Sequence, residues 1–208
     1  MAAAAPPRLV LASGSPRRRE LLEGMGLRFE VVPPEVDETF PPSLSPEEAA
    51  EALALAKARA VAGRRPGSLV LGADTIVLAP GRVLGKPSGR GEARAFLELL
   101  SGSTHRVVTG LAVGRAPDGP WQVGHASTEV TMRRIAPAEI EAYLESREWE
   151  GKAGAYAIQE TGDRFVTGLV GSRTNVVGLP VELAASFLRR AGFALPGGRA
   201  IEEAGGGG

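Results

Sequence analysis

The sequence predicts an α/β fold built on a mixed sheet. Apolar, strand-like segments and helical segments interleave along the chain. They do not follow the strict β-α-β alternation that produces an all-parallel sheet. A long hairpin is also expected over residues 104–134, because alternating segments flank the turn-forming run "APDGP". The 208 residues, 43% of them hydrophobic, suffice for one domain with a substantial core.

The first half of the chain predicts four strands and two helices. Residues 8–13 are an apolar strand that leads into a helix beginning at Ser15 and Pro16, and residues 27–34 are a second strand. The pattern of Ser45, Pro46 and Glu48 is a capping box, and it opens a helix through residue 63. Two strands joined at a Pro-Gly turn are expected within residues 68–87.

The second half predicts a helix over 91–102, the hairpin, and a helix over 137–147. A glycine-rich loop follows over 148–163, then two strand-like segments at 164–171 and 174–179 and a closing helix over 180–190. The ends, residues 1–7 and 194–208, are rich in small residues and are predicted to be disordered tails. A single domain is therefore expected over residues 8–193.

The charge balance limits the classes of partner. Lys plus Arg total 24 and Asp plus Glu total 24, so no global field attracts nucleic acid or an anionic membrane. An anion site must be local. The absence of cysteine excludes disulfides and thiolate metal sites. No apolar run approaches the roughly 18 residues of a membrane span, and the N-terminal residues do not resemble a signal peptide, so a cytoplasmic location is expected.

Three arginines follow the start of the first predicted helix. Arg17, Arg18 and Arg19 occupy its first turn, where the positive end of the helix dipole disfavours cations. One interpretation is a solvated turn in which Glu20 and Glu23 are partners. The other is a phosphate site formed by a Gly-Ser turn, free helix N–H groups and guanidinium groups. The spacing fits neither a Walker A loop nor a dinucleotide-binding motif.

Two polar residues interrupt the apolar run "LVLGADTIVL". Asp74 is poorly suited to a strand interior, and a buried carboxylate is costly unless a cation pairs with it. Asp74 and Thr75 are therefore candidate functional residues. The run "EVDE", which contains Glu35, Asp37 and Glu38, is either a source of a second metal-facing carboxylate or a solvated loop.

Several other residues have both a functional and a structural interpretation. Lys86 lies in "LGKP", on a loop or strand end from which it can reach a phosphate, whereas Lys57 near a helix end also complements the helix dipole. The segment "GKAGAYAIQ", with Lys152 and Gln159, indicates either close approach to a ligand or a tightly packed loop. His105 and His125 are too isolated to indicate a metal site or a catalytic triad, and we expect structural roles for them.

Many of these segments occur in a recognisable order and spacing: "ASGSPRR", "EVDE", "AKARAVA", "GADTIV", "LGKP", "LSGSTHRVVTG", "GKAGAYAIQ" and "NVVGLP". Over residues 8–193 the chain resembles the Maf family of nucleoside triphosphate pyrophosphatases. The resemblance implies hydrolysis of a nucleotide to its monophosphate and pyrophosphate with Mg²⁺ or Mn²⁺. It also implies a homodimer, and two lobes around a cleft with a mixed elongated sheet and flanking helices, as in the inosine triphosphate pyrophosphatase architecture.

The same resemblance implies roles for individual residues. The segment at residues 151–159 is similar to that of the subgroup that acts on dTTP and UTP. Asp74 would be the proton acceptor, and the positions that set substrate preference would be Arg17, Thr75 and Gln159. Phosphates would be bound by Arg17, Arg18, Lys57 and Lys86, and the metal by Glu38 and Asp74. Gly151 stands where many relatives have Asp, and Glu160 where Gly often follows the glutamine, which weakens the inference of base preference.

Two alternatives to this function remain. The Maf family is also linked to inhibition of septum formation, so the chain could be a nucleotide-binding regulator without turnover. The second alternative is a pyrophosphatase that prefers a nucleotide with another base, such as 7-methyl-GTP. The combination of Asp74, Lys86 and Glu38 favours catalysis, because a protein that only binds nucleotides does not need a general base.

Overall fold

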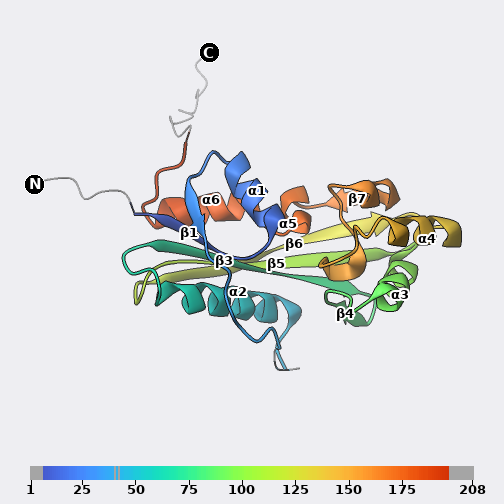
Figure 1. Cartoon of the computed structure of the whole chain (residues 1–208), viewed down its shortest axis with the longest axis horizontal. Helices are drawn as coiled ribbons and strands as arrows, with labels where there is room; N and C mark the ends of the chain where they lie inside the picture. Colours follow the sequence, from blue (N-terminus) through green and yellow to red (C-terminus); the bar gives the residue numbers. More distant parts are fainter. Residues whose placement is uncertain (1–6, 40, 42, 197–208) are drawn as a thin grey trace, which may run out of the picture.

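A computed structural model describes residues 7–39, 41 and 43–196 (Figure 1). Its central feature is a seven-stranded sheet in the order β2-β1-β3-β5-β6-β7, with β4 paired to β3. The strands are β1 (Leu9–Ala12), β2 (Phe29–Val31), β3 (Leu69–Ala79), β4 (Arg82–Leu84), β5 (Thr104–Arg115), β6 (Trp121–Met132) and β7 (Val166–Val170). The helices are α1 (Pro16–Gly24), α2 (Pro46–Ala62), α3 (Arg90–Leu100), α4 (Pro137–Glu145), α5 (Arg173–Val177) and α6 (Val181–Arg190), and η1 (Ala153–Ala155) and η2 (Thr161–Phe165) are 3₁₀ turns.

The sheet is mixed, as predicted. Strand β1 is parallel to both β2 and β3, whereas β3, β4, β5, β6 and β7 pair antiparallel. The predicted hairpin is the β5–β6 pair, which runs from Thr104 opposite Thr131 to Gly114 opposite Trp121. Strand β3 has 11 residues and β5 and β6 have 12 each, so these three strands connect the two ends of the molecule (Figure 1).

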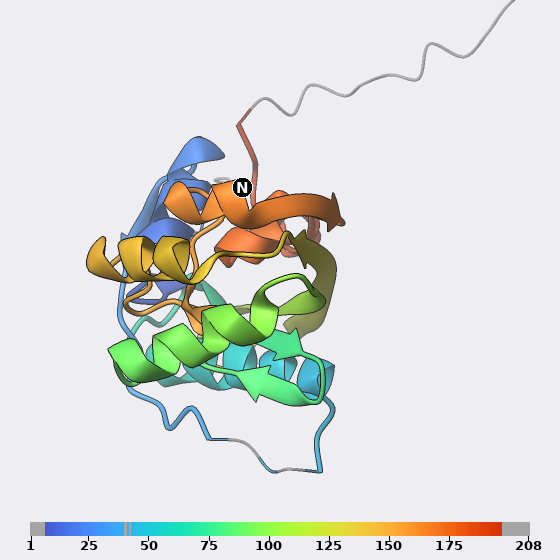
Figure 2. The same cartoon turned by 90° about the vertical axis from the view of Figure 1, so that its right-hand side faces the viewer.

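Separate hydrophobic clusters produce the expected two lobes. In one lobe, α2 covers one face of the sheet, and α1 and α6 cover the other (Figure 1). The second lobe contains β4, α3 and α4, and its core includes Phe96, Tyr143 and Phe165. Figure 2 looks at this end, where α3 and α4 pack together. The sheet is continuous between the lobes, so both share the same three long strands.

One edge of β3 is uncovered where the lobes meet. Strand β1 pairs with β3 only over residues 69–72, and β4 pairs with it over 77–79. Strand β5 occupies the other edge over residues 69–78. The edge of residues 73–76 is therefore left between β1 and β4. This segment contains Asp74 and Thr75.

Helix α2 lies unusually close to the sheet. A Cβ added at Gly110 would lie 2.1 Å from the Ala50 carbonyl oxygen, and one added at Gly72 would lie 2.4 Å from that of Ala54. No other amino acid fits at these contacts without moving the helix. The predicted capping box is present, since the Ser45 hydroxyl and Glu48 backbone N–H are paired. Both features fix the position of α2.

The prediction of a strand over residues 174–179 is wrong, because residues 173–177 form α5. The β-branched residues favour a strand, but local hydrogen bonds override that preference. The Ser172 hydroxyl accepts from the backbone N–H of Asn175, and Gly178 ends the helix with a φ of 124°. Asn175 itself is fully buried and donates to the Val107 carbonyl of β5. Strand β2 is also shorter than the predicted 27–34.

The predicted tails, residues 1–7 and 194–208, fall mostly outside the described residues. Among the helices that the structure describes, none is both long enough and apolar enough to cross a membrane.

Gly110→Ala tests the close contact between α2 and the sheet. The added methyl group meets backbone atoms that cannot turn aside, so we expect the free energy of unfolding to fall by about 3 kcal/mol. Gly91→Ala is the control, because a Cβ there has no atom within 4 Å. In helix α3 it should be neutral or stabilising by up to about 1 kcal/mol. Urea unfolding measures both; equal stabilities of the two variants would contradict the close contact.

His105 should make stability depend on pH. It is buried against Tyr156, its Nε2 lies 2.8 Å from the tyrosine oxygen, and burial lowers its pKa from 6.5 to about 4. As the pH falls below 6.5 the unfolded chain gains this proton first, so stability is lost. Between pH 7.5 and pH 5 this costs about 2 kcal/mol. Unfolding at both pH values should show this extra loss in the wild type relative to His105→Gln; parallel losses would contradict it.

Candidate active site

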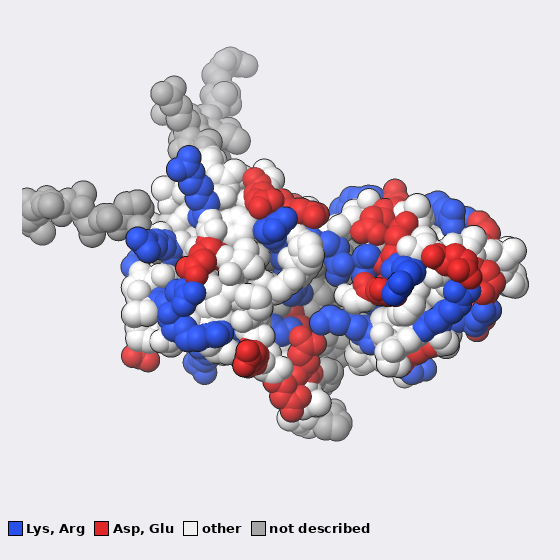
Figure 3. All heavy atoms as spheres, in the orientation of Figure 1, with Lys and Arg blue, Asp and Glu red and all other residues white. Residues whose placement is uncertain are grey.

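A cavity of about 790 Å³ lies where the lobes meet. It is lined by the turn between β1 and α1, the middle of β3, the segment around Glu38, the Lys86 loop, residues 150–160 and the end of α5. Figure 3 shows basic and acidic side chains around the hollow between the lobes. The uncovered edge of β3 contributes Asp74 and Thr75 to its wall.

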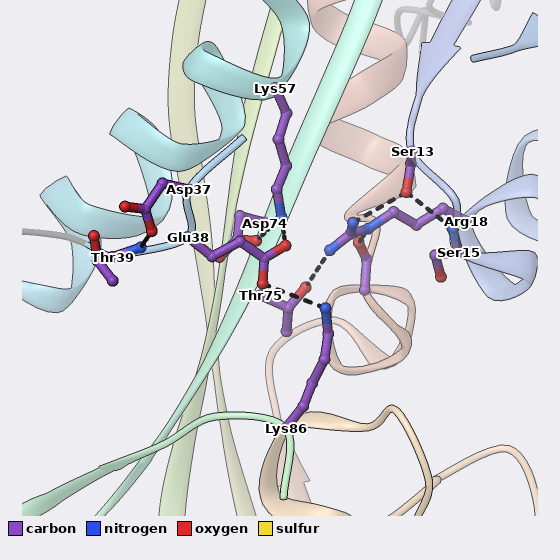
Figure 4. A network of polar contacts seen from close by, with 11 residues as sticks. Ser13, Ser15, Arg18, Asp37, Glu38, Thr39, Lys57, Asp74, Thr75 and Lys86 are labelled. Atoms are coloured by element: carbon purple, nitrogen blue, oxygen red, sulfur yellow. Dashed lines mark hydrogen bonds and ion pairs between the residues drawn. The ribbon is translucent and has the colours of Figure 1, made fainter. Parts of the chain in front are cut away.

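A chain of alternating charges crosses this cavity (Figure 4). Lys57 Nζ lies 2.5 Å from Asp74 Oδ1 and 2.7 Å from Glu38 Oε1. Lys86 Nζ lies 3.4 Å from Glu38 Oε2. Lys57 and Asp74 have side chains only 6% and 12% exposed, whereas Glu38 and Lys86 are about half exposed. The buried pair is therefore anchored at the base of the cavity, and the exposed pair lies at its mouth.

Lys57 is the cation that makes a carboxylate in the middle of β3 tolerable. An unpaired charge there would lose its hydration without compensation. Within the described residues, only Oδ1 of Asp74 is hydrogen-bonded, and its partner is Lys57. The second carboxylate oxygen, Oδ2, has no hydrogen-bond partner among those residues.

Glu38 is ionised at neutral pH. Partial burial raises its pKa, but the hydrogen bond and charge of Lys57, with those of Lys86, outweigh this and hold the pKa below its ordinary value. The other acidic residues of this segment do not join the cavity wall. Asp37 is exposed and accepts from the Thr39 backbone N–H instead (Figure 4). Of the "EVDE" carboxylates, the structure brings only Glu38 to the site.

Arg18 lies on the opposite face of β3 from Lys57. Its guanidinium donates to the Gly178 carbonyl at 2.8 Å, to Thr75 Oγ1 at 3.1 Å and to Ser13 Oγ at 3.2 Å. Burial lowers its pKa, and the charge of Asp74 opposes that shift. None of its three acceptors is charged. The arginine therefore holds a positive charge in the cavity wall that a bound anion can neutralise.

The start of α1 completes a region suited to anions. Ser15 is at the N-cap position, as predicted, but its side chain does not cap the helix. Arg17 also lines the cavity, and its Nε donates to the Val177 carbonyl at 3.4 Å. Arg19, by contrast, is exposed and pairs with Glu23. Of the three arginines, the structure thus turns two toward the cavity.

The glycine-rich loop carries Gln159 to the wall of the cavity. Three contacts hold this loop in place: the Ala157 N–H donates to the Tyr143 hydroxyl, Arg173 donates to the Ile158 carbonyl, and the Gly154 N–H donates to the Gly85 carbonyl. Gln159 is exposed. Its amide can therefore meet a ligand in the cavity.

The two histidines have structural contacts, as predicted. His105 is buried against Tyr156, and His125 Nδ1 lies 2.6 Å from Glu51 Oε1 at the surface. In the described ranges 7–39, 41 and 43–196, no cluster of three His, Cys, Asp or Glu side chains could hold a metal. Glu38 and Asp74 are the two carboxylates that meet in the cavity. Because one oxygen of each contacts the same Lys57 nitrogen, those oxygens lie at most about 5 Å apart.

Two carboxylates match the ligand set of a small divalent cation. Mg²⁺ usually takes one or two protein carboxylates and completes its shell with water and substrate phosphates. Glu38 and Asp74 are the residues that could supply such ligands, and one oxygen of each contacts Lys57 Nζ in this structure.

Sequence reasoning missed the backbone and buried groups that position the cavity residues. The carbonyls of Val177 and Gly178 hold both arginines, but a carbonyl has no sequence signal. Behind Thr75 lie the fully buried side chains of Thr109 and Asn175. The sequence signal for them is a polar residue in an otherwise apolar run: Thr109 in "RVVTGLAV" and Asn175 in "NVVGL".

Comparison with known proteins gives similar sequences across nearly the whole chain. A dTTP/UTP pyrophosphatase from Moorella thermoacetica is 53% identical over 184 residues, which cover 86% of this chain and 95% of that protein. A dTTP/UTP pyrophosphatase from Bacillus anthracis is 47% identical over 183 residues, covering 88% and 95%.

A solved structure agrees with the fold. The structure of a HAM1 protein from Coxiella burnetii has a TM-score of 0.51 at 18% identity, and the match covers 89% of this chain and 100% of that one. Residues 8–191 match the family described as Maf-like protein. The chain therefore belongs to the family of Maf-like proteins.

Proposed function

We propose that this protein is a nucleoside triphosphate pyrophosphatase that hydrolyses dTTP and UTP to the monophosphate and pyrophosphate. The observation that carries the proposal is the buried carboxylate of Asp74, held by Lys57 at the wall of a cavity that also contains Arg17, Arg18 and Lys86. Relatives at about half identity are named dTTP/UTP pyrophosphatases, which supports the same reaction here. A role in removing modified pyrimidine nucleotides is part of the proposal.

Asp74 is the general base in this proposal. Its free Oδ2 accepts a proton from water as the water oxygen attacks the α-phosphorus. The bond from that phosphorus to the oxygen that bridges the α- and β-phosphates then breaks. Nucleoside monophosphate and pyrophosphate are the products. Lys57 holds Asp74, which lines the cavity, in its position on the strand through Oδ1.

The cationic side chains stabilise the departing pyrophosphate. Arg17, Arg18 and Lys86 come from two different sides of the cavity. Negative charge accumulates on the leaving group as the bond breaks, and preorganised cations there lower the barrier. The N-terminus of α1 adds backbone N–H groups that face the same region.

Glu38 and Asp74 would hold the divalent cation, Mg²⁺ or Mn²⁺. When bound, that ion would neutralise phosphate charge and make the attacking water more acidic. Lys86 Nζ contacts Oε2 of Glu38, the oxygen that does not contact Lys57, so it also holds that carboxylate at the cavity mouth.

Gln159 is the proposed contact for the base. Its amide offers one acceptor and two donors, which match the N3–H and O4 groups of uracil and thymine. Arg17 and Thr75 share the role in substrate preference. Glu160 follows Gln159 and lies 3.3 Å from Lys152 Nζ. Glu160 stands where relatives often have glycine, and through this ion pair its side chain makes its contact inside the loop.

The homodimer stays a prediction, which sedimentation can test. The cytoplasmic location is proposed on chemical grounds, because nucleoside triphosphates are the substrates.

Turnover by the wild type and by Asp74→Asn tests the proposal. Pyrophosphate release from canonical, modified and 7-methylguanine triphosphates, with Mg²⁺ or Mn²⁺, should be fastest for dTTP and UTP. Asp74→Asn should lose about 10²- to 10⁴-fold in kcat, because the amide cannot accept the proton, while nucleotide binding persists. A wild type that binds nucleotides without turnover would favour the regulator. Faster pyrophosphate release from a guanine nucleotide than from dTTP and UTP would contradict the proposed base preference.

Substitutions of three exposed residues should separate recognition of the base from recognition of the phosphates. Gln159→Ala should change the ranking of bases, whereas Lys86→Ala should raise KM for every triphosphate by a similar factor of about 10. Arg19→Ala is the matched control and should change neither, because Arg19 pairs with Glu23 outside the cavity. Steady-state kinetics on dTTP, UTP and dCTP provide the test. Equal losses for all bases in Gln159→Ala would remove its role with the base.

A further inference from the structure

A buried chain of hydroxyl groups lies behind Thr75. Thr75 Oγ1 lies 3.0 Å from Thr109 Oγ1, and Thr109 Oγ1 lies 3.0 Å from the Asn175 carbonyl oxygen. Thr109 is on β5, directly opposite Thr75 in the sheet, and is fully buried. Asn175 is the middle residue of α5. The chain therefore joins a residue of the cavity wall to a short helix behind it.

The direction of these hydrogen bonds follows from the chemistry of the groups. A carbonyl only accepts, so the single hydroxyl proton of Thr109 points to Asn175. Thr109 can then only accept from Thr75, which commits the Thr75 proton to the interior. Arg18, which has donors alone, donates to Thr75 at 3.1 Å. All three hydrogen bonds run one way, from Arg18 toward α5.

This order leaves Thr75 with lone pairs and no proton for a ligand. One of its two lone pairs accepts from Arg18, and the second remains for the cavity, which Thr75 lines. A triphosphate oxygen, which is an acceptor, cannot hydrogen-bond to Thr75 in this state. An N–H or O–H group of the nucleoside can.

We propose that Thr109 is a positioning residue that fixes Thr75 as a hydrogen-bond acceptor, so that Thr75 selects a donor group of the nucleoside. The inference deepens the proposed function and rests on it. In dTTP and UTP the donors left for Thr75 are the sugar hydroxyls, because the proposed function assigns the base N3–H to Gln159. Thr109 does not touch substrate; it acts by holding the proton of Thr75.

Further hydrogen bonds hold Asn175 in place. Its side-chain amide donates to the Val107 carbonyl at 3.0 Å and to Thr128 Oγ1 at 2.9 Å. Its carbonyl also accepts from the Gly178 N–H at 3.0 Å. After removal of the Thr109 hydroxyl, the Asn175 backbone carbonyl still accepts from the Gly178 N–H. The C-terminal end of α5 is therefore preserved. The effect of such a change should reach Thr75 and go no further.

Thr109→Val is the decisive variant, with binding by calorimetry and turnover both measured. The probes are dTTP and two analogues: 2′,3′-dideoxy-TTP lacks the sugar donor, and N3-methyl-dTTP lacks the base donor assigned to Gln159. Wild type should disfavour 2′,3′-dideoxy-TTP by about 10- to 100-fold. The response to N3-methyl-dTTP should be the same in wild type and in Thr109→Val. In Thr109→Val the Thr75 hydroxyl can turn its proton toward the cavity, so the discrimination should shrink to within about threefold. Thr109→Ser keeps the hydroxyl and should restore the wild-type discrimination.

Thr128→Val is the matched control. It removes another fully buried hydroxyl that contacts Asn175, from β6, but it does not contact Thr75. It should lower thermal stability while the discrimination stays at the wild-type level. If Thr109→Val does not fold, Thr109→Ala removes the same hydroxyl without added bulk.

Retention of full discrimination by folded Thr109→Val would overturn the inference, as would a wild type that binds 2′,3′-dideoxy-TTP like dTTP. Binding that discriminates in the wild type but not in Thr109→Val supports the inference even if no pyrophosphate is released. The absence of pyrophosphate release would refute only the proposed function.

Discussion

The rest of the site depends on the ion pair between Lys57 and Asp74. A carboxylate in the middle of a buried strand folds only if a cation reaches it, and the cation is on a helix rather than on the sheet. Helix α2 must therefore lie close enough for a lysine near its end to contact β3. Gly72 and Gly110 allow this distance, because side chains there would meet the helix backbone. Two glycines that do not line the cavity thus support the position of the proposed general base.

The topology explains why the cavity forms at this point. Strands β1 and β4 share one edge of β3 but do not meet, and the uncovered edge between them lies at the junction of the lobes. Successive side chains of a strand point to opposite faces. Asp74 thus meets α2, whereas Thr75 meets Arg18 of α1 on the other face. A gap in the sheet edge gives a single cavity access to both faces.

The sequence was sufficient for most of the elements and for the identity of the charged residues. Asp74 was conspicuous because a carboxylate in an apolar strand needs a reason, and the capping box located α2 without ambiguity. The segment 174–179 was misassigned because three valine and leucine side chains suggest a strand, while the side chain of Ser172 and the glycine at 178 decide for a helix. The partners Val177 and Gly178 act through backbone carbonyls. Such contacts depend on the fold, and residue types do not encode them directly.

The division of β3 into two faces separates two tasks. On the α2 face, charges dominate: Lys57 sets the position of Asp74, and Glu38 continues the network to the cavity mouth. On the α5 face, hydrogen bonds to uncharged acceptors dominate: the C-terminal end of α5 holds Arg17 and Arg18 through the Val177 and Gly178 carbonyls, and it holds Thr75 through Thr109. Directional hydrogen bonds discriminate between donors and acceptors, whereas charges act on any phosphate. In the proposed mechanism, substrate preference can therefore change through α5 and its contacts without disturbing the carboxylate proposed to activate water.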